Sequence, residues 1–179
     1  MTDAQLFELI MAGMLAAASV RAGVTVDVKQ NYQPTQQGAQ TAPTLYVHKL
    51  FDKRVGHVQR KDVLDIPNDV FRHHEAQWYE TTFQVTALAA GNPLVPNLPS
   101  ASDLVNVGAD IMQSDAMMAR LRAANVGVLR VGEITNPQFV DDRDRFEASP
   151  SFDFVLTHKR EYIDGVPVVS SVEFNFARV

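Results

Sequence analysis

Residues 71–88 constrain the fold most strongly, because apolar and polar side chains alternate along much of this run. Tyr79, Phe83 and Val85 fall on one face, whereas Glu80 falls on the other. A period of two residues is typical of a strand in a sheet that buries one face. Strand character is also found at residues 24–28, 44–58, 126–134 and 151–162. Because strands mostly follow one another instead of alternating with helices, the sequence predicts an α+β fold with a mainly antiparallel β-sheet.

Two helices are expected to pack on this sheet. Thr2 and Gln5 have the spacing of a capping box at the start of the first helix. Ser100 and Asp103 repeat that spacing before a second helix, predicted over residues 101–124. Both runs place apolar residues three and four positions apart, which gives each helix one apolar face.

The C-terminal part of the chain predicts a β-hairpin. Asp164 and Gly165 form a turn signal. They separate residues 151–162 from residues 166–177, and apolar side chains alternate in both runs. The sequence therefore predicts two paired strands joined at Asp164 and Gly165.

The composition is that of one globular domain spanning residues 1–179. Of the 179 residues, 46% are apolar and none is cysteine, a length that fits a single compact domain. Without cysteine there is no disulfide framework, thiolate nucleophile or zinc finger. Sixteen Lys and Arg against 21 Asp and Glu give a net charge of −5, which argues against tight general binding to nucleic acid.

The apolar residues 7–20 raise the question of a signal peptide or membrane anchor. No Lys or Arg precedes them, and Asp3 and Glu8 lie where a signal peptide would be positive or apolar. The run is also too short to span a membrane. We therefore interpret it as part of the first helix, with no membrane partner.

Residues 30–43 predict a mobile loop. The run is rich in Gln, contains two Pro and lacks an aliphatic anchor, so it cannot bury enough surface to order itself. Long loops inside compact domains are often functional. We therefore name Gln36, Gln37 and Gln40 as candidate protein-interface residues.

No sequence motif of a nucleotide site, a zinc protease or a serine hydrolase is present. His73, His74 and Glu75 are the one cluster in the sequence whose side chains are typical metal ligands. On a strand, however, only His73 and Glu75 share a face, so we interpret the three residues as the polar start of a strand. We expect no catalytic residue, no metal site and no cofactor.

A charged run is the second candidate interface. Asp141, Asp142 and Asp144 are interleaved with Arg143 and Arg145. One interpretation is a solvated loop whose charges neutralise one another. The other is a contact loop, because alternating signs can set the register between two protein surfaces.

Trp78 is the third candidate. Its position in the alternation places it on the polar face, with Glu80 and Gln84. A Trp there either packs beneath a loop or helix or anchors a protein interface. Both interpretations remain open at this point.

Residues 145–154 have the sequence RFEASPSFDF and are followed by the predicted hairpin. With this motif the late part of the chain resembles the tail terminator, or neck terminator, proteins of tailed bacteriophages. Earlier parts agree in order. An N-terminal helix is followed by a strand that contains YETTFQV at residues 79–85, and then by a Pro-rich link and a second helix.

The resemblance implies a structural virion protein of the phage neck without catalysis. Such proteins form a ring, typically a hexamer, that caps the tail tube and joins it to the head connector or head-completion protein. In contractile tails they also contact the sheath protein. DNA passes through the lumen without specific binding, and the ring assembles in the host cytoplasm.

Two alternatives remain open beside the tail terminator. One is a head-completion or stopper protein in the same neck. The other is a small metal-binding enzyme that uses His73, His74, Glu75 or the carboxylates of residues 141–144.

Overall fold

A computed structural model describes residues 1–30, 42–89, 98–140 and 146–167 of the chain. Its helices are α1 (Asp3–Ala22), α2 (Ala101–Met112) and α3 (Asp115–Ala123), with a short 3₁₀ turn η1 (Ile66–Asn68). Its strands are β1 (Asp27–Gln30), β2 (Thr44–Asp65), β3 (Val70–Leu88), β4 (Gly127–Thr135), β5 (Gln138–Val140), β6 (Phe146–Ala148) and β7 (Ser151–Pro167).

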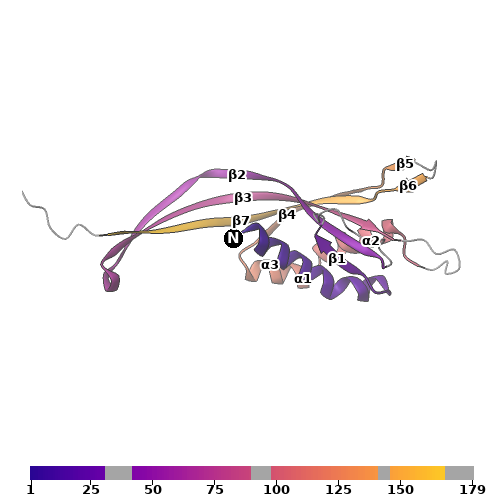
Figure 1. Ribbon diagram of the computed structural model, residues 1–179, viewed down its shortest axis with the longest axis horizontal. Coiled ribbons are helices and arrows are strands. Elements are labelled where there is room, and N and C mark those ends of the chain that lie inside the picture. Colours follow the sequence, from indigo (N-terminus) through magenta and orange to yellow (C-terminus); the bar gives the residue numbers. More distant parts are fainter. Residues whose placement is uncertain (31–41, 90–97, 141–145, 168–179) are drawn as a thin grey trace, which may run out of the picture.

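The predicted α+β fold with a mainly antiparallel sheet is confirmed. Five strands form one sheet in the order β1-β2-β3-β7-β4, in which only the β1–β2 pair is parallel. The helices lie together on one side of this sheet (Figure 1). Strands β5 and β6 form a separate two-stranded sheet.

The hydrophobic core lies between the helices and the part of the sheet that they cover. We use the term body for the helices together with this covered part of the sheet. The predicted face of β3 is buried there, since Phe83 and Val85 have no exposed surface. Phe83 stacks on Phe154 of β7, with ring centroids 5.4 Å apart. Gly108 of α2 lets the helix approach the sheet, because a Cβ atom there would lie 3.3 Å from the Phe152 ring.

Helix α1 forms as predicted and belongs to the core. Thr2 and Gln5 make the expected capping box. With 20 residues of high mean hydropathy, α1 would also be long and apolar enough to cross a membrane. In the fold, however, it packs against the sheet and α2, through five buried residues: Leu6, Phe7, Ile10, Met14 and Ala18.

The predicted second helix is in fact two helices. Ser100 and Asp103 form the capping box of α2, as expected. The chain then breaks at Gln113, and the Ser114 side chain accepts a hydrogen bond from the Met117 amide to begin α3. The new axis changes which side chains face inward, so that Met117 and Leu121 are buried.

Strands β2, β3 and β7 continue far beyond the helices as a curved three-stranded arm (Figure 1). We define the arm as residues 54–79 and 158–167, which include the 3₁₀ turn η1 at its tip. Its register shifts between Val55 and Gln59, where β2 has extra residues opposite β3. Gln77 fills this bulge, and its Nε2 donates to the Val55 carbonyl over 2.6 Å. Such a bulge bends the strands.

The predicted turn at Asp164 and Gly165 is wrong. Strand β7 runs straight through both residues, which pair with His73 and Arg72 of β3. The local turn preference is overridden because β3 extends to Val70 and its backbone groups pair with β7 along the whole length. The second predicted strand lies largely beyond Pro167, outside the described residues.

Candidate assembly site

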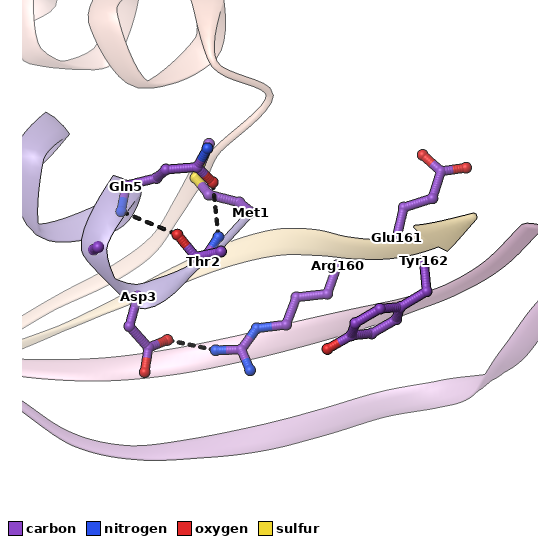
Figure 2. Close-up of a pocket in the computed structure, with 8 residues that line it drawn as sticks. Met1, Thr2, Asp3, Gln5, Arg160, Glu161 and Tyr162 are labelled. Atoms are coloured by element: carbon purple, nitrogen blue, oxygen red, sulfur yellow. Dashed lines mark hydrogen bonds and ion pairs between the residues drawn. The ribbon is translucent and has the colours of Figure 1, made fainter. Parts of the chain in front are cut away.

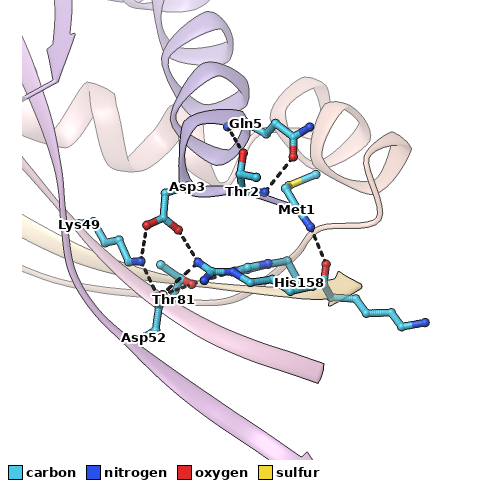
Figure 3. A network of polar contacts seen from close by, with 10 residues as sticks. Met1, Thr2, Asp3, Gln5, Lys49, Asp52, Thr81 and His158 are labelled. Atoms are coloured by element: carbon cyan, nitrogen blue, oxygen red, sulfur yellow. Dashed lines mark hydrogen bonds and ion pairs between the residues drawn. The ribbon is translucent and has the colours of Figure 1, made fainter. Parts of the chain in front are cut away.

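The arm meets the body at a polar network beside the first turn of α1 (Figure 3). Asp3 of α1 contacts two cations, Lys49 of β2 and Arg160 of β7. The distance from Lys49 Nζ to Asp3 Oδ2 is 2.8 Å. One helix is therefore tied by charge to two strands of the sheet.

Asp52 is the second carboxylate of this network. It lies 2.5 Å from Lys49 Nζ and 3.4 Å from Arg160, and it accepts a hydrogen bond from the Thr81 hydroxyl over 2.7 Å. Burial opposes ionisation of Asp52, but the hydrogen bonds from Lys49 and Thr81 and the nearby cations outweigh it and lower its pKa. Burial alone would lower the pKa of Lys49, but its hydrogen bonds to Asp3 and Asp52 and their negative charges outweigh burial and raise that pKa.

His158 is a fully buried histidine in the same network. Its Nε2 lies 2.9 Å from the Thr81 hydroxyl oxygen. Because Thr81 gives its one proton to Asp52, His158 must be the donor and carries its proton on Nε2. Burial, followed by the charges of Arg160 and the N-terminus, lowers its pKa to about 4. The ring is therefore neutral at physiological pH, and its Nδ1 has no partner among the described residues.

Arg160 links the network to the aromatic residues of the arm base. Its guanidinium lies 4.7 Å from the centre of the Tyr79 ring, and Tyr79 stacks on His158 at 5.8 Å. Partly buried charges in such a network depend on one another, because removing one leaves its partner without compensation. The network therefore joins α1 to β2 and β7 at the point where the arm leaves the body.

Beyond this base, no helix among the described residues covers either face of the arm (Figure 1). Its large apolar side chains are consequently exposed, by between 37% for Val55 and 79% for Ile66. Natural proteins rarely leave a group of this kind uncovered unless it contacts a partner. The group comprises Val55, Val58, Val63, Leu64, Ile66, Phe71, Trp78, Tyr162, Ile163 and Val166.

Charged side chains on the arm are paired across strands. Glu75 lies 2.8 Å from Arg60, and His73 lies 2.5 Å from Asp62. The hydrogen bond with Asp62 raises the pKa of His73, and the one from Arg60 lowers the pKa of Glu75. Exposed pairs of this kind stabilise little but favour one register of the strands.

Two grooves flank the outer edge of β7 where α1 begins, each with a volume of about 550 Å³. One is lined by the first turn of α1 together with Arg160 and Tyr162 (Figure 2). The other is lined by Trp78, His158 and Lys159 among others. Tyr162 leaves β7 toward one face and Glu161 toward the other (Figure 2). The two grooves thus lie on either side of one strand edge.

Of the candidate interface residues, the structure describes one. Trp78 is 42% exposed on the arm, opposite Val55 and Lys159 in the sheet register. It therefore does not lie beneath a helix or loop of the described chain. The other candidates lie outside the described residues, namely Gln36, Gln37 and Gln40 within the predicted mobile loop, and Asp141, Asp142, Arg143, Asp144 and Arg145 between β5 and β6.

The His73, His74 and Glu75 cluster is divided between the two faces of β3, as the alternation predicts. His73 contacts Asp62 and Glu75, whereas His74 contacts Glu161 of β7. Among the described residues, no group of three or more His, Asp or Glu side chains could hold a metal ion.

The sequence interpretation missed the polar network, although one signal was present. His158 and Arg160 continue the alternation of Phe152, Phe154 and Leu156, which places both on the core face of β7. A histidine and an arginine on a buried face require partners. The partner of Arg160, Asp3, comes from the distant first helix, and no sequence spacing reveals that contact.

The family model of the E217 gateway protein gp29 matches residues 5–168 of this chain. The match begins in the first turn of α1 and extends past the end of β7, so it includes the body and the arm. No curated protein matches the sequence.

Proposed function

The chain belongs to the family of the E217 gateway protein gp29, and we propose that it acts as the tail terminator at the phage neck. The family is one of structural proteins of the head–tail neck. The observation that carries the proposal is this match, which covers most of the chain. In the proposal, residues 1–179 form one domain, and its copies form a hexameric ring on the tail tube.

The uncovered arm supports a role in assembly. A cyclic ring needs two different surfaces on each copy, one of which contacts the other on the neighbour. The arm carries exposed apolar residues away from the body, and the network around Asp3 and Asp52 joins α1 to β2 and β7 at its base. A projecting element is suited to reach a neighbouring chain.

The proposed partners are those of a neck ring. They are the tail tube protein, the head connector or head-completion protein and, in a contractile tail, the sheath protein. The net charge of −5 on each chain suits a lumen through which DNA passes without being held, because a basic lumen would bind phosphate. No catalytic step is part of the proposal.

The test is the mass of the purified full chain by light scattering, alone and with purified tail tubes. A hexamer that binds the head-proximal tube end and blocks further growth is the expected result. A strict monomer that fails to cap tubes would contradict the proposal. Binding to the portal in the absence of the tube would instead support a head-completion or stopper protein.

A charge reversal tests the predicted contact loop. Arg143→Glu with Arg145→Glu is expected to impair ring formation or tail joining without unfolding the domain, because it breaks the alternation of signs. Arg21→Glu with Arg122→Glu is the matched control, since it makes the same charge change at two exposed helical positions. Normal assembly of the loop variant would show that residues 141–145 are only a solvated surface.

A further inference from the structure

The outer part of β7 has an open backbone edge. Strand β4 pairs with β7 only as far as Thr157, and no described strand pairs with this edge beyond it. The Met1 ammonium donates to the Lys159 carbonyl over 2.9 Å from that open side. Because backbone groups alternate between two neighbours in an antiparallel ladder, Glu161, Ile163 and Gly165 also direct their N–H and C=O groups outward.

This edge has only part of the usual protection against added strands. Proteins normally block such edges with charged side chains, proline, bulges or a covering loop, and here Glu161 and Asp164 are charged and Met1 occupies the Lys159 carbonyl. Here the pairing of β3 with β7 has no register shift, and proline occurs only at Pro167. Tyr162 is 65% exposed and Ile163 51% exposed beside the edge. The edge is long, regular and partly apolar, which are the properties of a strand-addition site.

The grooves on the two faces complete such a site. A strand added to an edge gains affinity from backbone hydrogen bonds and specificity from pockets for alternate side chains. One groove offers Arg160 and Tyr162 (Figure 2), and the other offers Trp78 and Lys159. Successive side chains of an added strand would therefore enter opposite grooves.

A strand of suitable composition is present in the chain itself. Residues 168–179 have the sequence VVSSVEFNFARV, in which Val172, Phe174 and Phe176 alternate with polar or small residues. Fully extended, this segment spans roughly 40 Å, and the open edge from Glu161 to Pro167 spans roughly 23 Å. The segment is therefore long enough to cover the edge.

The turn chemistry argues against addition to the same molecule. The segment would have to reverse direction at once after Pro167, and tight hairpin turns need Gly, Asn or Asp. Asp164 and Gly165 are already used inside β7, and the residues that follow Pro167 are Val168 and Val169. These β-branched residues disfavour the positive φ angles of such turns.

We propose that residues 168–179 of one chain add as a strand to the open β7 edge of a second copy. The donor segment and the acceptor edge are different surfaces, so the contact can repeat around a ring. This inference rests on the proposed function in one respect, namely that copies of the chain assemble with one another. It names the surfaces that make that contact.

Cysteine cross-linking tests the proposal, because the natural chain contains no cysteine. One preparation carries Ile163→Cys, and three others carry Val172→Cys, Phe174→Cys or Phe176→Cys. Each donor preparation is mixed with the acceptor preparation, allowed to assemble and treated with a short bis-maleimide. A covalent dimer of donor and acceptor chains is expected for at least one pair. The control replaces the acceptor cysteine by Leu15→Cys, an exposed position on α1, and should give none.

Three outcomes would overturn the inference. The first is an assembled chain without any cross-link between donor and acceptor. The second is a cross-link formed only within one chain that carries both cysteines. The third is a cross-link of the donor cysteine only to a tail tube or sheath protein. If the full chain is a monomer under all conditions, the proposed function fails as well.

Truncation after Pro167 gives an independent readout. The shortened chain keeps every described residue, so it should fold and lose assembly. A synthetic peptide of residues 168–179 should bind the shortened chain, and binding should be lost when Phe174 and Phe176 are both replaced by Asp. A truncated chain that assembles like the full chain would refute the strand addition and leave the proposed ring intact.

Discussion

The body and the arm share the strands β2, β3 and β7 but differ in what covers these strands. In the body, one face of β2, β3 and β7 is buried under helices, and Phe83 and Phe154 are inaccessible to solvent. In the arm, the same strands carry exposed apolar residues such as Phe71 and Val166. The body therefore contains the interactions that fold the chain. The arm holds its shape through strand pairing and presents surface for other molecules.

The comparison also shows why the junction is polar. Apolar packing ends where α1 begins, and the network of Asp3, Asp52, Thr81, His158 and Arg160 takes its place. Such a network favours one geometry, because its members are satisfied only in one arrangement. The junction should consequently control the orientation of the arm more than the stability of the body.

The largest expected effect is a core truncation in the body. Phe154→Ala removes a fully buried ring and should lower the free energy of unfolding by about 3–5 kcal/mol. The matched change in the arm, Phe71→Ala, should cost about 1 kcal/mol or less because the ring is already 41% exposed. Denaturant unfolding measures both. Equal losses would contradict the division into a folding body and a presenting arm.

The next effect is a pH dependence that arises at the junction. His158 has a pKa of about 4 in the fold against an ordinary value of 6.5. Between these two pH values the unfolded chain binds a proton at His158 and the folded chain does not. The free energy of unfolding is therefore unaffected by His158 above pH 6.5 and falls as the pH drops toward 4, by up to about 3 kcal/mol. Urea unfolding at several pH values should show this slope.

A matched pair of variants tests whether His158 causes this pH dependence of the free energy of unfolding. His158→Gln keeps a donor for Thr81 and should remove most of the slope between pH 6.5 and 4. His57→Gln changes an exposed arm histidine and should leave the slope as it is. If both variants keep the full slope, His158 is not the group that titrates.

A smaller effect is expected from one carboxylate of the network. Asp52→Asn leaves Lys49 and Arg160 with one counter-charge, Asp3, and should lower the free energy of unfolding by about 1–3 kcal/mol. Asp27→Asn, which removes a charge from the outlying Lys29 pair, is the control. No difference in the free energy of unfolding between the two variants would show that the contacts of Asp52 do not stabilise the junction.

Much of the fold was predictable because it depends on local patterns. The alternation at residues 79–87 identified the buried face of β3, and both capping boxes marked true helix starts. The predictions that failed depend on distant contacts. Asp164 and Gly165 signal a turn locally, but pairing with β3 holds them in a strand. Asp3 meets Arg160 only because the fold brings α1 to β7.

The smallest expected effect concerns the exposed ion pairs of the arm. Arg60→Ala removes one of the two partners of Glu75, whose side chain is 39% exposed, and water and salt already screen that pair. We expect no measurable change in the unfolding midpoint of the monomeric chain. Its effect should appear in assembly instead, because a charge that sets register between strands can also set register between copies. Light scattering across a salt series, with Lys29→Ala as a body control, separates the two roles. A clear shift of the unfolding midpoint would mean that the arm contributes to folding of the single chain, and the contrast between the two regions would then be one of degree.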